Sequence, residues 1–326
     1  MAKNSPYISQ QLIAQELRPA LAQLPSTSLS TRNLPKVRNA IRQATQLQLG
    51  NVPAELLEVD CQSIRLPSDF GGPDIPALMY TPKNRGTNLP VALHFHGGGY
   101  ILGEPGVNDT QNRTLAKTLG CVVVSVAYRL APEHPYPSAL QDGLSALNWL
   151  HSNAQCLAID PSRIALIGES AGAGLAAAIA LHSRGSLPHP VKHLLLDAPM
   201  LDDRSQHLSV SHPYCGEYSW TAQNNHFAWR AYLAAEPGGE SAPEGAVPAR
   251  ETDLSGMPAT FLIVGALDLF LNENLVFGNR LIQCGVPVEL HVIPGAFHAY
   301  GIAGPEAPQV KQTHALKYQA LTRAWQ

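Results

Sequence analysis

A serine flanked by two glycines is the feature of this sequence that most clearly could do chemistry. The segment Gly168-Glu169-Ser170-Ala171-Gly172 follows the apolar run IALI (164–167) and precedes the small-residue run AGLAAAIAL. A buried strand that turns sharply into a helix at such a segment lifts the serine hydroxyl to the edge of a sheet. Side chains at the flanking positions would not fit so tight a turn, and the helix N-terminus favours developing negative charge. The pattern predicts Ser170 as a nucleophile.

A serine hydroxyl needs a base, and the base needs a third group to orient it. After a strand–serine–helix turn of this kind, the acid and then the histidine follow along the chain. Three histidines come late enough: His291, His298 and His314. His291 alternates within the apolar strand 288–293, and His314 falls in the last helical pattern. His298 follows that strand through a short loop, at the strand's carboxyl end, so we predict it as the base.

The best candidate for the acid is Asp268, which follows the apolar run TFLIV (260–264) and a short turn. It therefore lies at the carboxyl end of a strand, the same edge as the predicted base. Asp253 precedes that strand and falls at the opposite edge, while Glu273 is a candidate helix-start residue. Three acids that follow an earlier strand stay as minor rivals: Asp197, Asp202 and Asp203.

A glycine-rich loop offers the groups that could stabilise an oxyanion. His96-Gly97-Gly98-Gly99 comes directly after the apolar run PVALHF (90–95). Three glycines let the backbone approach a substrate carbonyl without steric clashes from Cβ atoms. Backbone N–H groups fixed in place stabilise a tetrahedral oxyanion, and the N–H of Ala171, next to the nucleophile, would supply one donor. We interpret His96 as a residue that orients this loop rather than as a base.

The elements that must position these residues alternate along the chain. Near-continuous apolar strands separated by helical patterns predict a mostly parallel sheet covered on both faces, led in by a few antiparallel strands. Such sheets place their chemistry at the carboxyl ends of the strands. The predicted strands are residues 56–66, 77–80, 90–95, 121–127, 164–167, 194–196, 260–264 and 288–293, and the predicted helices between them are 108–119, 139–153, 170–183 and 272–284.

Two regions lie outside this alternation. The first 50 residues are helical in pattern, with one amphipathic helix predicted from Ser5-Pro6 to Pro25 and a second ending before Gly50. An insertion at about 203–250 separates two strands and carries an aromatic-rich helix. We predict residues 1–50 as a helical cap segment and 51–326 as one catalytic domain with a cap insertion. The aromatic side chains could either contact a substrate or pack only on the core.

Composition excludes several classes of protein. The 326 residues are 45% hydrophobic and 14% charged, with a formal net charge of −3 and no basic block. Nucleic-acid binding is therefore not expected. Five widely spaced cysteines without a CxxC pair predict free thiols, no zinc site and a reducing compartment. No stretch reaches the ~18 apolar residues that a membrane span needs, and the N-terminus lacks a signal-peptide pattern. We expect a cytoplasmic protein.

Together these motifs resemble the hormone-sensitive-lipase-like family of bacterial esterases and lipases. The resemblance spans residues 91–300 and includes a further segment, YRLAPEHPYP (128–137). It implies an α/β-hydrolase fold with a helical cap, hydrolysis of short- to medium-chain acyl esters, and no cofactor or metal. It assigns the oxyanion donors to Gly98, Gly99 and Ala171 and gives residues 128–137 a structural role. It also suggests a possible homodimer through the edge of the sheet at the last strand.

The sequence departs from the family pattern at three places. Glu169 stands where Asp is common, DLFLNEN (268–274) replaces the usual DPLRDEG, and Ala299-Tyr300 follows His298 where Gly-Phe is usual. None removes a predicted triad residue, so substrate range is what these changes put in doubt. The alternatives left open are an amidase or arylacetamide deacetylase, a lactonase or biosynthetic tailoring hydrolase, and a small-molecule receptor that performs no catalysis.

Overall fold

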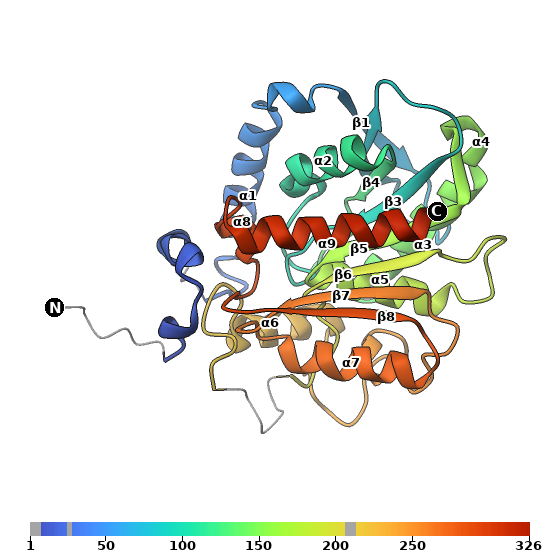
Figure 1. Cartoon of the computed structure of the whole chain (residues 1–326). Helices are drawn as coiled ribbons and strands as arrows, with labels where there is room; N and C mark the ends of the chain where they lie inside the picture. Colours follow the sequence, from blue (N-terminus) through green and yellow to red (C-terminus); the bar gives the residue numbers. More distant parts are fainter. Residues whose placement is uncertain (1–7, 25–27, 206–212) are drawn as a thin grey trace.

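In the part of the chain that the structure describes, one sheet of eight strands forms the centre of the molecule. The computed structural model describes residues 8–24, 28–205 and 213–326. The strand order is β1-β2-β4-β3-β5-β6-β7-β8; β2 is antiparallel to both of its neighbours, and all strands from β4 to β8 are parallel (Figure 1). The strands are β1 (Val59–Leu66), β2 (Ile75–Pro82), β3 (Leu89–Phe95), β4 (Val122–Val126), β5 (Ile159–Glu169), β6 (His193–Asp197), β7 (Ala259–Gly265) and β8 (Val288–Ile293).

The predicted mostly parallel sheet is confirmed. All five residues of β4 and six of the seven in β3 are buried, as expected for strands covered on both faces. The first strand begins three residues later than predicted, because Ala54–Leu56 forms a short 3-10 turn, η3, before the chain extends. β5 begins earlier than its apolar run, at Ile159.

Helices cover the two faces of the sheet. One apolar core includes residues of α3, α5 and α7, and a second core on the other face includes residues of α2 and α9. Figure 1 shows α9 crossing the sheet in front of β5 and β6. The helices are α2 (Asp109–Leu119), α3 (Ser138–Ser152), α4 (Ala154–Leu157), α5 (Ala171–His182), α7 (Leu271–Gln283), α8 (Tyr300–Ala303) and α9 (Pro308–Trp325), with the 3-10 turn η4 (Pro105–Asn108) before α2.

The N-terminal region differs in part from the prediction. The second predicted helix is present as α1 (Leu34–Leu49), but the single amphipathic helix before it is wrong within the described residues. Two 3-10 segments, η1 (Gln10–Leu12) and η2 (Gln15–Gln23), take its place. The chain is extended at Ala14, whose N–H donates to Gly295 O at 3.1 Å, and this docking interrupts any continuous helix. The predicted limits at Ser5-Pro6 and Pro25 lie outside the described residues.

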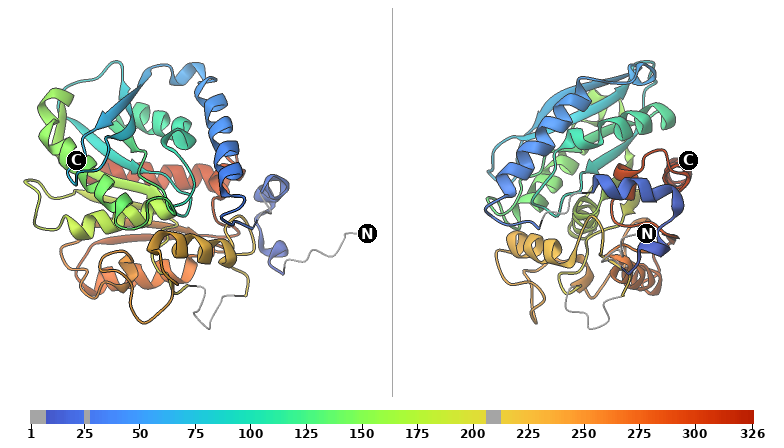
Figure 2. Two further views of the ribbon diagram at one scale, coloured as in Figure 1. Left: turned by 180° about the vertical axis from the view of Figure 1, so that it is seen from behind. Right: turned by 90° about the vertical axis from the view of Figure 1, so that its left-hand side faces the viewer.

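The insertion, residues 203–250, carries α6 (Ala222–Leu233) and the 3-10 turn η5 (Pro248–Arg250). The N-terminal region lies beside it (Figure 2). The N–H of Leu29 donates to Asn224 Oδ1 at 2.8 Å, and that of Ser9 donates to Glu217 Oε2 at 2.9 Å. The two predicted cap segments are therefore in direct contact, although their role as a cap stays a prediction.

Two further observations concern the molecule as a whole. Among the described residues, no helix combines the length and apolar character required to cross a membrane. All five cysteines lie in the described ranges, and each has a free thiol: Cys61, Cys121, Cys156, Cys215 and Cys284. The expectation of free thiols therefore agrees with the structure.

Candidate active site

Ser170 lies at the turn between β5 and α5. Its backbone has φ 55° and ψ −121°, a conformation that residues other than glycine rarely adopt. A Cβ atom at Gly168 would lie 2.6 Å from the backbone of Gly172, and one at Gly172 would lie 2.0 Å from Phe95 O, so neither position accepts a side chain. The Ser170 N–H donates to Asp197 O at 2.8 Å, and the Met200 N–H donates to Ser170 O at 3.0 Å. These bonds hold the strained turn.

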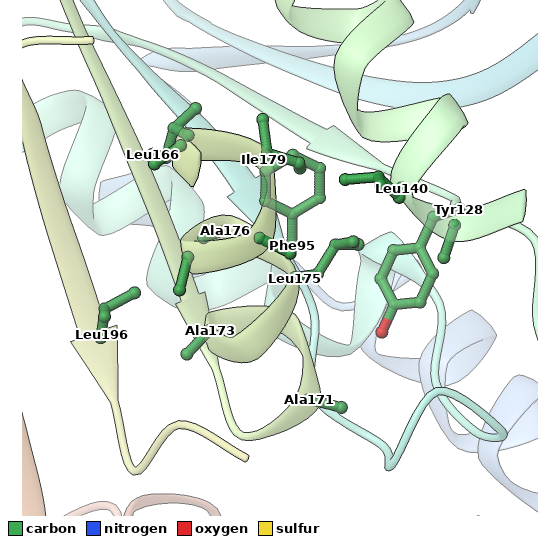
Figure 3. Packing of buried hydrophobic residues seen from close by; sticks show 14 of the residues in the cluster. Phe95, Tyr128, Leu140, Leu166, Ala171, Ala173, Leu175, Ala176, Ile179 and Leu196 are labelled. Carbon is green, nitrogen blue, oxygen red and sulfur yellow. The ribbon is translucent and has the colours of Figure 1, made fainter. Parts of the chain in front are cut away.

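The helix behind the serine packs closely because its side chains are small. Figure 3 shows Ala173 and Ala176 on α5 among larger residues of neighbouring strands, Leu166 and Leu196. A Cβ atom at Gly174 would lie 2.1 Å from the carbonyl oxygen of Met200. The run AGLAAAIAL thus lets α5 sit directly against the sheet and the chain after β6, with its N-terminus at Ser170.

The structure brings Ser170, His298 and Asp268 together. His298 Nε2 lies 3.0 Å from Ser170 Oγ, and His298 Nδ1 lies 2.8 Å from Asp268 Oδ2. The second oxygen of Asp268 accepts the N–H of Phe270 at 2.9 Å, and the Phe270 ring meets the His298 ring edge-on at 5.1 Å. All three side chains are buried. A hydroxyl, an imidazole and a carboxylate in this chain of contacts are suited to nucleophilic acyl transfer.

The rival residues lie elsewhere or are engaged in other contacts. His291 is on β8, where it bonds Glu289 at 2.8 Å, and His314 is on α9. Glu273 accepts the N–H of Leu201 at 2.6 Å and lies buried under the chain that leaves β6. The remaining acids have partners of their own: Asp197 with Lys317, Asp202 with Arg204, Asp203 with Arg250, and Asp253 with the N–H of Ser255.

The oxyanion loop, residues 96–99, follows β3 and passes next to the serine. Gly98 has φ 127° and Gly99 has φ 62°, and a Cβ atom at Gly98 would lie 2.2 Å from Leu102 O. A Cβ atom at Gly97 would lie 3.4 Å from Ser170 Cβ, which places the loop against the nucleophile. Across the described ranges, no acceptor is bonded to the N–H of Gly98, Gly99 or Ala171. These donors are thus available to a ligand.

The His96 side chain orients this loop, as predicted, through contacts with the loop backbone and with Tyr128. Its Nδ1 donates to Gly97 O at 2.9 Å, and its ring stacks on Tyr128 with the centroids 4.3 Å apart. The Tyr128 hydroxyl donates to the carbonyl oxygen of His96 at 2.7 Å. Burial lowers the pKa of His96 to about 4, so its ring is neutral at physiological pH. A neutral, stacked ring is suited to orienting the loop.

The segment 128–137 ties the oxyanion loop to both predicted cap segments. The Ala131 N–H donates to Tyr100 O at 2.9 Å, and the Tyr136 N–H donates to Tyr232 O of α6 at 2.8 Å. Arg38 of α1 donates to Ala131 O and forms a two-point contact with Glu133. The structural role that the resemblance implied for this segment agrees with these contacts.

Sequence reasoning missed the particular position of Trp220. Its ring lies so close to Gly99 that a Cβ atom there would be 2.4 Å from Trp220 Cη2, and it is 6.4 Å from the His298 ring. Its Nε1 donates to Asn225 Oδ1 at 3.2 Å, which fixes the ring. The aromatic content of the insertion was visible in the sequence, but nothing in it indicated which aromatic residue meets the oxyanion loop. In contrast, Trp229 is fully buried in the core.

No cluster of three or more His, Cys, Asp or Glu residues that could hold a metal ion is present among the residues described.

Comparisons with known proteins agree with this architecture. A family model described as the alpha/beta hydrolase fold matches residues 92–302. Carboxylesterase NlhH of Mycobacterium tuberculosis is 32% identical over 289 residues, which cover 87% of this chain and 89% of that protein. A solved bacterial heroin esterase is 34% identical with a TM-score of 0.88, covering 98% of this chain and 99% of that one. Esterase LipW from Mycobacterium marinum is 33% identical with a TM-score of 0.88, covering 98% of both chains.

The fold and the site define an α/β hydrolase, and the chain belongs to that family. Within it, the chain belongs to the hormone-sensitive-lipase-like esterases and is a carboxylesterase. Both the predicted family and the predicted class of enzyme are confirmed.

Proposed function

We propose that the chain hydrolyses short- to medium-chain acyl esters through an acyl-enzyme intermediate. Ser170 is the nucleophile, His298 the general base, and Asp268 the group that orients the imidazole and stabilises its charged form. The observation that carries this proposal is the pair of contacts at 3.0 and 2.8 Å that joins the three side chains across β5, β7 and β8.

In the first half of the reaction, His298 Nε2 takes the proton of Ser170 as Oγ attacks the ester carbonyl. The carbonyl oxygen becomes negatively charged and accepts N–H donors from Gly98, Gly99 and Ala171. The tetrahedral intermediate collapses, the bond to the alcohol oxygen breaks, and His298 returns the proton to the leaving alcohol. The acyl group is then bonded to Ser170 Oγ.

In the second half, water replaces the alcohol. His298 takes a proton from the water, the hydroxide oxygen attacks the acyl carbon, and the same N–H donors hold the new oxyanion. The bond to Ser170 Oγ breaks, and the proton on His298 returns to the serine. A carboxylic acid leaves and the enzyme is restored, so no cofactor is consumed.

The division of the chain is part of the proposal. Residues 1–50 and the insertion at about 203–250 act as a cap above the strand ends, and the remaining residues form the catalytic domain. The contacts of Ser9 with Glu217 and of Leu29 with Asn224 support this division, because they join the two cap segments to each other. The buried position of Trp220 against Gly99 supports a site enclosed by the insertion.

The test is hydrolysis of p-nitrophenyl esters with acyl chains from two to sixteen carbons. We expect turnover of short chains by the wild type and a loss of about 10⁴-fold or more in Ser170→Ala, because the nucleophile is removed. Ser162→Ala, at the opposite end of β5, is the matched control and should keep wild-type activity. A folded Ser170→Ala variant that retains wild-type turnover would refute the assignment.

Assays with further substrates and a covalent label separate the alternatives. An amidase or a lactonase would turn over anilides or lactones in preference to esters, with the same dependence on Ser170. A receptor would hydrolyse none of these compounds, and Ser170 would fail to react with a fluorophosphonate. A cytoplasmic location, ester substrates of small size and a homodimer remain predictions.

A further inference from the structure

A charged cluster lies beneath the serine turn, on the face of the sheet that α9 covers. Glu169 and Asp197 are register partners at the ends of β5 and β6, so their side chains point to the same face. Lys317 of α9 forms an ion pair with Asp197. His94 of β3 donates to Glu169 at 3.0 Å. We refer to Glu169 and Asp197 as the carboxylate pair.

The carboxylate pair is directly attached to the catalytic turn. Glu169 precedes Ser170 in the chain, and the carbonyl oxygen of Asp197 accepts the N–H of Ser170 at 2.8 Å. Asp197 also lies between the strands that lead to Ser170 and to Asp268, since β6 pairs with β5 on one side and with β7 on the other. Both residues are therefore attached to the backbone of the catalytic turn, and the charge of the Asp197 carboxylate interacts with the His298 imidazole.

The charges of this cluster influence one another. Burial raises the pKa of Asp197 above its ordinary value and Glu169 adds to this increase, whereas Lys317 and, more weakly, the His298 imidazole act in the opposite direction. Burial lowers the pKa of Lys317, but the carboxylate pair raises it above its ordinary value, so the ammonium group stays charged. Burial raises the pKa of Glu169, yet His94 and Lys317 together hold it below its ordinary range.

Other titratable groups face the cluster from several elements. His96 of the oxyanion loop and His314 of α9 are both neutral near pH 7, because burial lowers the pKa of each to about 4. Tyr300 of α8 stays protonated, since burial and Asp197 raise its pKa. Neither of these histidines can thus compensate the carboxylate pair near neutral pH, whereas Lys317 is held in contact with it.

We propose that Lys317 is a positioning residue for the esterase reaction: its ammonium group compensates the carboxylates of Glu169 and Asp197 and so sets the pH at which His298 can act as the base. This inference rests on the proposed role of His298. Lys317 touches no reacting atom, and it acts only through the charge that it neutralises behind the serine turn.

The sign of the effect follows from the charges. Lys317→Met removes the ammonium charge that compensates the carboxylate pair. The added net negative charge near His298 favours the protonated imidazole, which cannot accept a proton from Ser170. The acid limb of kcat/KM then moves to higher pH. We expect a shift of roughly half to one pH unit, typical of one unit charge at short range in a partly solvated site. Activity well above the limb falls much less.

The experiment measures kcat/KM for a short-chain p-nitrophenyl ester from pH 5 to 9 at constant ionic strength. Lys317→Arg retains the charge and should keep the wild-type midpoint. Asp197→Asn in the Lys317→Met background removes one of the uncompensated carboxylates and should return the midpoint toward the wild-type value. Lys311→Met is the matched control: it lies on the same helix but pairs with Glu306 in solvent, and its profile should match the wild type.

The possible results are distinct. A folded Lys317→Met variant whose acid limb coincides with that of the wild type overturns the proposal, and so does a shift that Asp197→Asn fails to reverse. If Lys317→Met does not fold, the single variant Asp197→Asn provides the test. It removes one negative charge and leaves Lys317 to compensate Glu169 alone, so the limb should move to lower pH; an unchanged limb overturns the proposal. Failure of the proposed function looks different, since the wild type would then be inactive or its profile would be flat.

Discussion

At the scale of the residue, the serine turn requires glycine at positions 168 and 172, where no side chain would fit. Ser170 has a positive φ, and the chain on either side of it lies against backbone atoms of neighbouring segments. Such strain persists only where the surrounding structure holds it, here through the bonds of Ser170 to Asp197 and Met200. The stability of the fold and the position of the nucleophile are therefore linked at this turn.

This linkage makes Gly172→Ala a severe substitution. The new Cβ atom would lie 2.0 Å from Phe95 O and 2.4 Å from His96 O, which are backbone atoms of β3 and of the oxyanion loop. We expect a loss of at least about 3 kcal/mol in the free energy of unfolding and loss of esterase activity. Denaturant unfolding and ester hydrolysis check this. Gly86→Ala, with no atom within 4 Å of the new Cβ, is the control, and equal stability of the two variants would contradict the prediction.

Much of the proposed triad could be predicted from the sequence because strand ends carry positional information. Ser170, Asp268 and His298 each follow an apolar strand, and the carboxyl ends of parallel strands meet at one edge. Lys317 was not predicted, and Trp220 was only one of several aromatic residues that could contact a substrate or pack on the core. Lys317 on α9 and Trp220 in the chain before α6 reach the site only through tertiary packing. Those contacts depend on the length of α9 and on the path of the insertion, and local sequence patterns predict neither.

At the scale of the element, α6 and the chain before it bring an aromatic wall to the site. The Trp220 ring lies against Gly99, and its centroid is 6.4 Å from that of the His298 ring, to which it is tilted. Its indole N–H is bonded to Asn225, at the start of α6. Ala228 of α6 also lies at Gly99, 3.1 Å from where a Cβ atom there would be. We therefore expect the insertion, and the Trp220 ring above all, to limit the space around the reacting carbonyl.

Removing that ring should broaden the range of esters. Trp220→Ala is expected to raise the ratio of kcat/KM for bulky esters to that for acetate esters by about ten-fold or more, because changes of this size in an apolar pocket alter discrimination to that extent. Parallel assays with acyl and alcohol series measure the ratio. Trp220→Phe should give a smaller change, and an unaltered ratio in a folded Trp220→Ala variant would count against a limiting role for this ring.

The N-terminal elements show where periodicity alone was insufficient. The apolar positions of α1 repeat as in a helix, and α1 is present. The residues before it have similar apolar spacing, yet they form η1 and η2, separated by an extended residue that docks on Gly295. Pro19 within η2 also removes a backbone donor. A long-range bond and a missing donor decided the local conformation there.

At the scale of the whole molecule, buried histidines make stability depend on pH. Burial lowers the pKa of His96, His193 and His314 to about 4 each, against an ordinary value of 6.5. Below about pH 6.5 the unfolded chain binds protons at these positions while the folded chain does not. Their stabilising effect is therefore complete above pH 6.5 and is lost progressively as the pH falls toward 4.

His193 is suited to a test because it lies at the start of β6, at the opposite end of the strand from Asp197. We expect His193→Leu to reduce the slope of the free energy of unfolding against pH, between pH 5 and 6.5, by up to about 1.4 kcal/mol per pH unit, the value for one proton. Urea unfolding at several pH values measures the slope. A slope equal to that of the wild type would show that His193 does not contribute.

The long spans of the contacts at the site affect how the molecule regains its activity. The bond between His298 and Ser170 joins residues 128 positions apart, that between Lys317 and Asp197 spans 120, and that between Ser9 and Glu217 spans 208. Contacts of high sequence separation require loop closure before they contribute, so they favour slow folding. Recovery of esterase activity after dilution from denaturant should consequently lag behind recovery of the far-ultraviolet circular dichroism signal. Ester turnover would then report when the long-range tertiary contacts of the whole chain have formed.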